Sequence, residues 1–226
     1  MPDHQHWLDR WTENRIGFHQ SSVNQHLLNF FPESGLSRGA SVFMPLCGKA
    51  HDIAWLAQQG HEVTGIELSE VAIQAFFEEQ SLGYQVFESD RFVLYKSDSN
   101  NLLKGDFFDL EAADLAQCEF VYDRASLIAM DSEQRPDYYR HMKALFPQGR
   151  QMLLITLEYN QSEMLGPPFA VAEAEVRSEY EALYDIERLE RDDIIDEGPR
   201  WRKVGLSALH EVVFRLTPRS FDEGAR

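Results

Sequence analysis

The sequence predicts an α/β fold built on a mainly parallel sheet. Four short apolar segments have the length of buried strands, and each is followed by a helical or polar segment. They are residues 40–44, 62–67, 119–123 and 151–158. Strands that alternate with helices favour parallel pairing, because each helix returns the chain to the same end of the sheet. No Gly/Ser-rich or Pro-rich linker divides the chain, so we expect a single domain over residues 1–226.

Three helices are expected around the first strands. The first covers residues 51–59 and stops at Gly60, a residue suited to the position after a helix end. The second covers residues 69–80, and Ser69 is its expected N-cap. The third covers residues 132–145, where apolar side chains recur at helical spacing.

The remaining segments are expected to complete the sheet. Residues 91–104 read as two short strands around a turn at 97–101. A helix is expected over 171–183, followed by strands at 184–189 and 210–216. This pattern suits both a methyltransferase sheet and a nicotinamide-binding Rossmann sheet, so the loops must decide between them.

Composition excludes several classes of partner. The chain has 21 basic and 38 acidic residues, for a net charge of −17. Such a surface repels phosphate backbones, so we expect no nucleic-acid partner. No apolar run approaches the ~20 residues that a membrane helix needs, and the polar first ten residues do not resemble a signal peptide. We therefore expect a cytoplasmic protein that does not bind membranes.

Metal and disulfide chemistry are not expected. The eight histidines show no His-x-x-x-His or Cys-x-x-Cys arrangement, so no metal site is predicted. Cys47 and Cys118 are expected to be reduced thiols. Without a heptad pattern, a monomer is the default expectation.

Three loops follow the carboxyl ends of the predicted strands, where ligands bind in open α/β sheets. They cover residues 45–50, 67–70 and 123–127. The first has Gly48 as its only glycine and is neither a Walker A loop nor Gly-x-Gly-x-x-Gly. By itself this loop does not identify a ligand.

Two charged residues stand at strand ends. Glu67 lies about 20 residues beyond Gly48, the spacing at which an acidic residue binds the ribose of a nucleotide cofactor. It could equally cap the helix that follows. Arg124 could bind an anionic ligand through its planar fork of donors, or it could form an ion pair with Asp123.

Three aromatic residues near the start of the chain have two interpretations. Trp7, Trp11 and Phe18 could wall a cofactor and hold a sulfonium by cation–π attraction. They could also be the buried side of an N-terminal helix.

Several motifs are similar to those of the thiopurine S-methyltransferase family, and the chain resembles its shorter, bacterial-type members. They occur in order: Gly17-Phe18-His19-Gln20, Met44-Pro45-Leu46-Cys47-Gly48-Lys49-Ala50, Gly65-Ile66-Glu67-Leu68-Ser69-Glu70, Tyr122-Asp123-Arg124-Ala125-Ser126-Leu127 and Gly166-Pro167-Pro168-Phe169. The resemblance implies a class I S-adenosylmethionine-dependent methyltransferase fold. This is a Rossmann-like, mainly parallel, seven-stranded sheet with helices on both faces.

The resemblance also implies a site for S-adenosyl-L-methionine, with residues 1–30 as a helical cover over it. The implied roles place Glu67 on the ribose and Arg124 near the methionine moiety and the acceptor. The other implied site residues are Trp7 or Trp11, Leu46 and Gly48 around the cofactor, Asp106 and Phe107 beside the adenine, and Phe18 over the acceptor.

The implied reaction is transfer of a methyl group by in-line displacement, with Arg124 as the catalytic residue that stabilises a thiolate. The implied acceptor is a small thiol of the thiopurine type, or a selenium or tellurium compound in metalloid detoxification. Three other readings remain open: a methyltransferase that acts on a halide or oxygen nucleophile, a nicotinamide-dependent oxidoreductase, and a non-catalytic binding protein. The missing Gly-x-Gly-x-x-Gly counts against the oxidoreductase.

Overall fold

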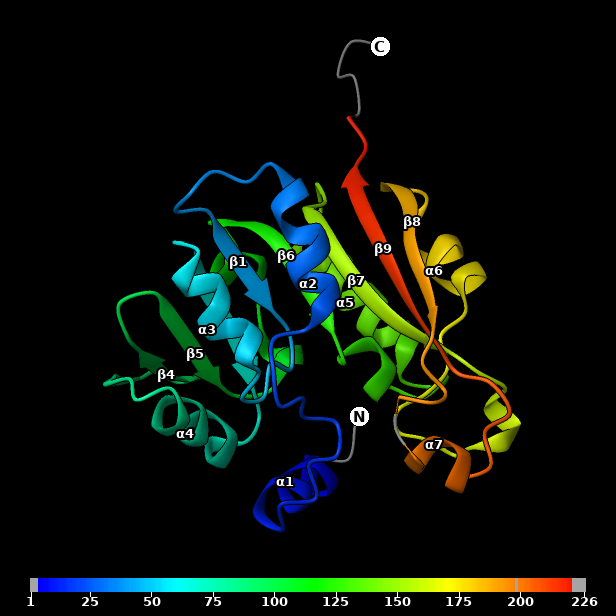
Figure 1. Ribbon diagram of the computed structural model, residues 1–226. Coiled ribbons are helices and arrows are strands. Elements are labelled where there is room, and N and C mark those ends of the chain that lie inside the picture. Colours follow the sequence, from blue (N-terminus) through cyan, green and yellow to red (C-terminus); the bar gives the residue numbers. More distant parts are fainter. Residues whose placement is uncertain (1–3, 198, 221–226) are drawn as a thin grey trace.

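Five parallel strands form the centre of the sheet, as predicted. The computed structural model describes residues 4–197 and 199–220, and Figure 1 shows their arrangement. The central strands follow the order β5-β2-β1-β6-β7, and each pairs with its neighbour in parallel. Their bounds are β1 Ser41–Met44, β2 Glu62–Glu67, β5 Asn100–Lys104, β6 Cys118–Arg124 and β7 Gln151–Glu158.

Antiparallel strands extend the sheet at both edges. On one side β9 (His210–Pro218) pairs with β7, and β8 (Tyr184–Asp193) forms the edge. On the other side β4 (Val93–Lys96) pairs with β5, and β3 (Gln85–Glu88) forms the edge. The sheet has nine strands, two more than the seven expected, because the hairpin of β3 and β4 is added beyond β5.

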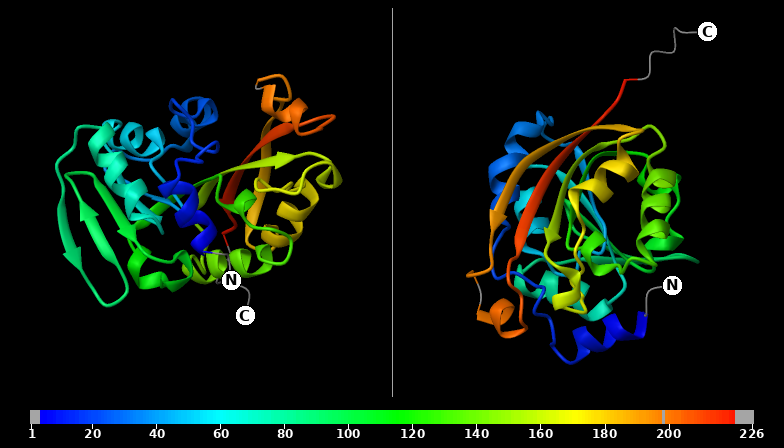
Figure 2. Two further views of the ribbon diagram at one scale, coloured as in Figure 1. Left: turned by 90° about the horizontal axis from the view of Figure 1, so that it is seen from below. Right: turned by 90° about the vertical axis from the view of Figure 1, so that its right-hand side faces the viewer.

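Helices cover both faces of the sheet (Figure 2). Along β1, Val42 and Met44 pack with side chains of α2, α3 and α4, whereas Phe43 packs with those of α5 and α6. Burial of both faces explains the consecutive apolar residues of β1, β6 and β7. The helix bounds are α2 Gln25–Phe30, α3 His51–Gln58, α4 Glu70–Glu79, α5 Arg135–Leu145 and α6 Glu173–Tyr180.

The predicted helices are confirmed, with shorter bounds at several ends. The helix expected from residue 132 begins at Arg135. The preceding residues form a turn, because the Asp131 carboxylate accepts hydrogen bonds from the N–H groups of Glu133 and Gln134. The helix expected over 171–183 covers Glu173–Tyr180. Short 3₁₀ helices lie at Phe31–Ser34, Phe107–Asp109, Ala112–Leu115, Leu127–Ala129 and Gln161–Glu163.

Two further helices lie at one end of the sheet. In Figure 1, α1 (His4–Thr12) and α7 (Pro199–Lys203) lie at the bottom, the end to which the arrows of β1 and β5 point. Residues 13–24 connect α1 to α2. Within the expected N-terminal cover, residues 1–3 lie outside the described residues. Among those described, no helix has both the length and the apolar character to cross a membrane.

Candidate active site

One cavity of about 810 Å³ lies at the carboxyl ends of β1, β2 and β6. It is also lined by α1, by residues 17–25 and by α7. Ligands of open α/β sheets bind outside these strand ends. The structure brings all of the predicted site residues to this cavity: Trp7, Trp11, Phe18, Leu46, Gly48, Glu67, Asp106, Phe107 and Arg124.

Glu67 ends β2 as a buried carboxylate, with 7% of its surface exposed. One oxygen accepts a hydrogen bond from the backbone N–H of Gly48 at 2.9 Å, and the other accepts from the N–H of Ser69 at 2.8 Å. Burial raises the pKa of Glu67 to about 7, although the backbone hydrogen bonds oppose the shift. The N-cap of α4 is Ser69, whose hydroxyl accepts from the N–H of Ala72. Glu67 thus supports the N-terminus of α4 through Ser69, but capping alone does not account for its second hydrogen bond, to Gly48.

The loop after β1 turns through two left-handed positions, Leu46 at φ 43° and Gly48 at φ 54°. Such backbone is rare for residues with a side chain. A Cβ at Gly48 would lie 2.9 Å from Cζ2 of Trp11 and 4.0 Å from Oε2 of Glu67. Glycine thus lets the Trp11 indole pack directly on the loop and beside the carboxylate.

Phe18 lies between the two tryptophans. Its ring centroid is 5.7 Å from that of Trp7 and 5.4 Å from that of Trp11, both nearly edge to face. The guanidinium of Arg10 lies 5.4 Å from the Phe18 centroid and 5.7 Å from the Trp7 centroid. Trp11 is buried and touches the Gly48 loop, whereas Trp7 is partly exposed. The cluster is therefore both packed and part of the cavity wall.

Asp106 and Phe107 form the turn after β5. One oxygen of Asp106 caps the 3₁₀ helix by accepting from the N–H of Phe108 at 2.9 Å. The other lies 3.1 Å from Nε2 of His4 on α1. Phe107 is 4% exposed and lines the cavity. The turn is thus fixed by its own cap and touches the N-terminal helix.

Arg124 ends β6 and lies partly exposed at the cavity. The alternative of an ion pair with Asp123 is wrong, because Asp123 is fully buried and accepts a 2.7 Å hydrogen bond from the hydroxyl of Tyr138 instead. Successive strand residues point to opposite faces, which separates Asp123 from Arg124. Within the described part of the chain, the guanidinium of Arg124 forms no hydrogen bond or ion pair with another side chain or with the backbone. Its donors are therefore available to a ligand.

Both cysteines are free and buried. Cys47 lines the cavity, but burial and the neighbouring Glu67 raise the pKa of its thiol well above the usual value. Burial also raises the pKa of Cys118 to about 12. Neither thiol is an activated nucleophile.

The sequence did not point to several polar residues of the cavity wall. Asp52 lies in the first turn of α3 and is 2% exposed. One of its oxygens accepts from the N–H of Asn24 at 2.7 Å, and the other lies 3.4 Å from the hydroxyl of Tyr122. Burial raises the pKa of Asp52, and the charge of Arg124 is among the effects that oppose this shift. In the sequence, only its position shortly after the Gly48 loop could have indicated that Asp52 lies at the cavity.

Three more charged residues, Glu197, Arg200 and Glu211, reach the cavity from the C-terminal part of the chain, and two of them lie on described elements. Arg200, on α7, donates a hydrogen bond to the carbonyl of Gly17, so α7 touches the N-terminal segment. Glu211 comes from β9. Neither residue belongs to a local motif, and only the folded chain brings them to the cavity.

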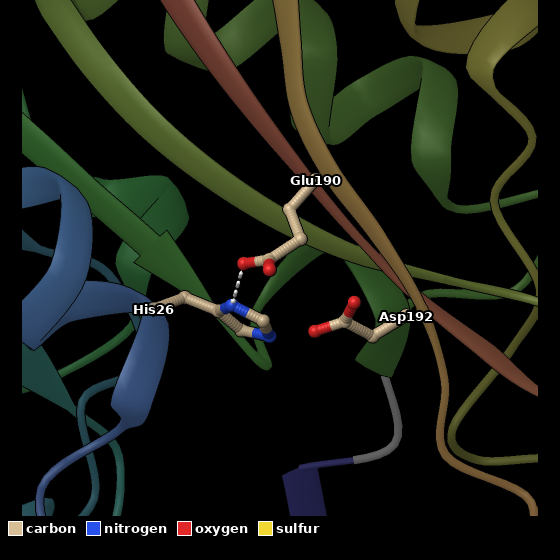
Figure 3. Close-up of side chains that lie close together, drawn as sticks. All are labelled: His26, Glu190 and Asp192. Atoms are coloured by element: carbon tan, nitrogen blue, oxygen red, sulfur yellow. Dashed lines mark hydrogen bonds and ion pairs between the residues drawn. The ribbon is translucent and has the colours of Figure 1, made fainter.

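A histidine and two further carboxylates lie beside Glu211. Figure 3 shows His26, Glu190 and Asp192, whose possible metal-ligand atoms lie within 4.8 Å of one another. Nδ1 of His26 lies 3.0 Å from Glu190, and Nε2 lies 2.9 Å from Glu211. Burial would lower the pKa of His26, but hydrogen bonds and charges of Glu211 and Glu190 outweigh it and raise this pKa. The geometry fits a protonated imidazole between two carboxylates, and a metal ion would have to displace one of them.

Sequence comparisons relate nearly the whole chain to one family. Residues 2–219 match the family model described as Thiopurine S-methyltransferase. A relative of that name from Nitrosospira multiformis is 43% identical over 216 residues, which are 96% of this chain and 98% of the relative. Another of the same name from Pseudomonas aeruginosa is 45% identical over 210 residues, with 93% and 96% covered.

Solved structures are similar in fold. A SAM-dependent methyltransferase from Anabaena variabilis superposes with a TM-score of 0.64 at 12% identity, covering 97% of this chain and 96% of the other. The 1,6-didemethyltoxoflavin-N1-methyltransferase of Burkholderia thailandensis gives 0.62 at 17% identity, with 95% and 87% covered. These likenesses confirm the predicted methyltransferase fold.

Proposed function

The chain belongs to the thiopurine S-methyltransferase family of S-adenosylmethionine-dependent enzymes, and we propose that it methylates a small thiol, selenol or tellurium acceptor in the cavity described above. The observation that carries the proposal is the buried Glu67 at the end of β2, with Gly48 and Trp11 packed against it. A carboxylate at this position accepts hydrogen bonds from the two neighbouring hydroxyls of a ribose.

The residues present fit the cofactor. Because Gly48 has no Cβ, the Trp11 indole lies against this loop beside Glu67 and forms part of the cavity wall. Phe107 offers a flat apolar surface for an adenine ring, and Asp106 lies next to it. Trp7, Trp11 and Leu46 would wall the same half of the cavity. We include residues 4–30 as a cover over this half, since α1 touches the Asp106 turn.

In the proposed mechanism the bound cofactor supplies a sulfonium methyl group that is open to in-line displacement. Arg124 holds the acceptor as its thiolate, because a nearby positive charge lowers the pKa of a thiol. Phe18 covers the acceptor and limits the access of water. Positioning of the nucleophile behind the methyl carbon can contribute up to about 7–11 kcal/mol. Glu67 and Phe107 would hold the cofactor, which would supply a methyl group bonded to a cationic sulfur, and Arg124 would hold the acceptor thiolate that takes this group.

The test is an acceptor panel of benzenethiol, benzeneselenol, phenol and iodide, with methylated products measured by mass spectrometry. We expect the thiol and the selenol to be methylated. Arg124→Ala should lower kcat/KM for the thiol about 10- to 150-fold, the value of a hydrogen bond to a charged group. Preference for phenol or iodide would contradict the acceptor class, and full activity of Arg124→Ala would contradict the role of the arginine.

We further propose a monomeric, cytoplasmic enzyme that takes part in metalloid detoxification. The two free, buried thiols suit a reducing compartment. Size-exclusion chromatography with light scattering and cell fractionation test the first two parts. Growth of a deletion strain on selenite or tellurite tests the third.

A further inference from the structure

A buried tyrosine supports Phe107 from behind the cavity. Tyr138, on α5, is fully buried, and its ring stacks on Phe107 with centroids 5.0 Å apart and an interplanar angle of 23°. Its hydroxyl donates a 2.7 Å hydrogen bond to Asp123 at the end of β6. The ring under Phe107 is therefore held at its far end by a carboxylate of the sheet.

The same helix holds the Asp106–Phe107 turn at a second point. His141 lies one turn after Tyr138 on α5. Its ring meets Phe107 edge to face, with centroids 4.8 Å apart at 80°. Nε2 of His141 lies 2.9 Å from the carbonyl oxygen of Phe107, so this nitrogen donates the hydrogen bond. Side chain and backbone of Phe107 are thus both fixed by α5.

The Asp123–Tyr138 hydrogen bond is costly to break. Asp123 is completely buried, and the tyrosine hydroxyl is a short, charge-assisted partner for it. Burial raises the pKa of Asp123 to about 6, although the Tyr138 hydrogen bond opposes the shift. Without the Tyr138 hydroxyl, the buried carboxyl of Asp123 would lose a hydrogen-bond donor, and the Tyr138 ring would lose its anchor and could move.

From this geometry we propose that Tyr138, held by Asp123, is a positioning residue that orients Phe107 for binding of the cofactor's adenine ring. This inference rests on the proposed function, which places S-adenosylmethionine in the cavity. Tyr138 does not touch the cavity itself, and it acts through the stacked pair of rings. The side chain of Arg124, around which the acceptor half is proposed, points to the other face of β6 from that of Asp123, so we expect Tyr138 not to affect the acceptor half.

The test compares Tyr138→Phe with Tyr139→Phe in calorimetric titrations with S-adenosylhomocysteine. Tyr139 is the matched control, because it is the next residue of the same helix and only 2% exposed. Its hydroxyl also donates to a carboxylate, that of Glu175 at 3.2 Å, but its ring contacts Tyr180 and not Phe107. Each variant therefore loses one hydroxyl–carboxylate hydrogen bond.

We expect Tyr138→Phe to weaken binding of S-adenosylhomocysteine about 3- to 10-fold relative to Tyr139→Phe. The variant keeps its ring but loses the anchor that orients it, so the loss does not exceed the free energy of the aromatic pair. In steady-state assays the KM for S-adenosylmethionine should rise, while the KM for the acceptor at saturating cofactor stays the same. Equal cofactor affinity of the two variants, or a rise in the acceptor KM alone, would overturn the inference.

A second variant serves if Tyr138→Phe does not fold. His141→Ala removes the other support of Phe107 from a partly exposed position. We expect it also to weaken binding of S-adenosylhomocysteine and not of the acceptor, and unchanged cofactor affinity would count against the inference. Wild-type protein that fails to bind S-adenosylhomocysteine would instead refute the proposed function.

Discussion

The protonation state of Glu67 is central at the scale of single residues. Its oxygens accept from two backbone N–H groups, yet burial raises its pKa to about 7. Between pH 4.5 and 7 the folded protein keeps the Glu67 proton that the unfolded chain has already lost. The free energy of unfolding therefore falls as pH rises through this range. Ribose hydroxyls donate best to the ionised form. Ligand binding should therefore be linked to the loss of this proton.

We predict that the affinity for S-adenosylhomocysteine rises with pH, by up to about tenfold per pH unit below about 7, and levels off above it. Glu67→Gln should bind more weakly and lose this pH dependence, because its amide does not titrate. Calorimetric titrations of both proteins at pH 6, 7 and 8 measure the effect. A wild-type affinity that does not change over this range would contradict the assignment.

At the scale of elements, one buried carboxylate anchors the end of the segment that carries Phe18. Asp52 of α3 accepts the backbone N–H of Asn24 at 2.7 Å. The side chain of Asn24 in turn caps α2 by accepting from the N–H groups of His26 and Leu27. The end of the segment over residues 13–24 is therefore fixed by a single buried carboxylate.

We predict that Asp52→Ala raises the acceptor KM about 5- to 100-fold, the range for a buried hydrogen-bond partner lost. The affinity for S-adenosylhomocysteine should change much less, because Glu67, Gly48 and Phe107 do not depend on this anchor. Asp52→Asn keeps an oxygen that can accept the hydrogen bond from the N–H of Asn24. Its acceptor KM should therefore lie between the values of Asp52→Ala and wild type. Steady-state kinetics with a thiol acceptor decide this, and an unchanged acceptor KM would disprove the anchoring role.

Elements that bury both faces were predictable from the sequence, and others were not. The strands β1, β6 and β7 carry consecutive apolar residues because helices cover both sides of the sheet. β3 was missed because all four of its residues are exposed, so it carries no pattern of burial. α7 was missed because it is only five residues long and lies in a polar stretch. A helix of that length gives no readable periodicity.

Some residues of the candidate site were likewise predictable from the sequence, and others were not. Glu67 and Arg124 were predictable because they stand at the ends of readable strands, and the resemblance supplied Asp106 and Phe107. Arg200 and Glu211 reach the cavity through the tertiary fold alone. The contact between Tyr138 and Phe107 could not be predicted from the sequence either, because helical spacing indicates only which residues are buried.

At the scale of the whole molecule, His26 joins distant parts of the chain. It connects α2 to Glu190 on β8 and to Glu211 on β9, residues 164 and 185 positions away. Asp192 adds a third carboxylate nearby, and the chain as a whole carries a net charge of −17. A positive charge on His26 is therefore favourable, in agreement with the raised pKa of its imidazole.

We predict that His26 stabilises the fold in a pH-dependent way. Since its folded-state pKa lies above the unfolded value of about 6.5, its contribution is complete below that pH and is lost as pH rises through the folded-state pKa. His26→Gln should lower the free energy of unfolding by about 1–3 kcal/mol at pH 6 and by less at pH 9. Urea unfolding at both pH values measures this difference.

His61→Gln is the control for this comparison. His61 is as buried as His26, but its ring contacts the carbonyl oxygen of Ala40 and not a carboxylate. An equal loss of stability at pH 6 and pH 9 in His26→Gln would show that the imidazole is not charged in the folded protein.

The most direct test of the central claim is calorimetric titration of S-adenosylhomocysteine into wild type and Glu67→Ala at pH 8, where Glu67 is ionised. We expect wild type to bind one equivalent. Glu67→Ala should retain its fold and bind at least about tenfold more weakly, because a charged acceptor of hydrogen bonds is lost. Equal binding by the two proteins, or no binding by folded, ligand-free wild type, would contradict the assignment of this cavity to S-adenosylmethionine.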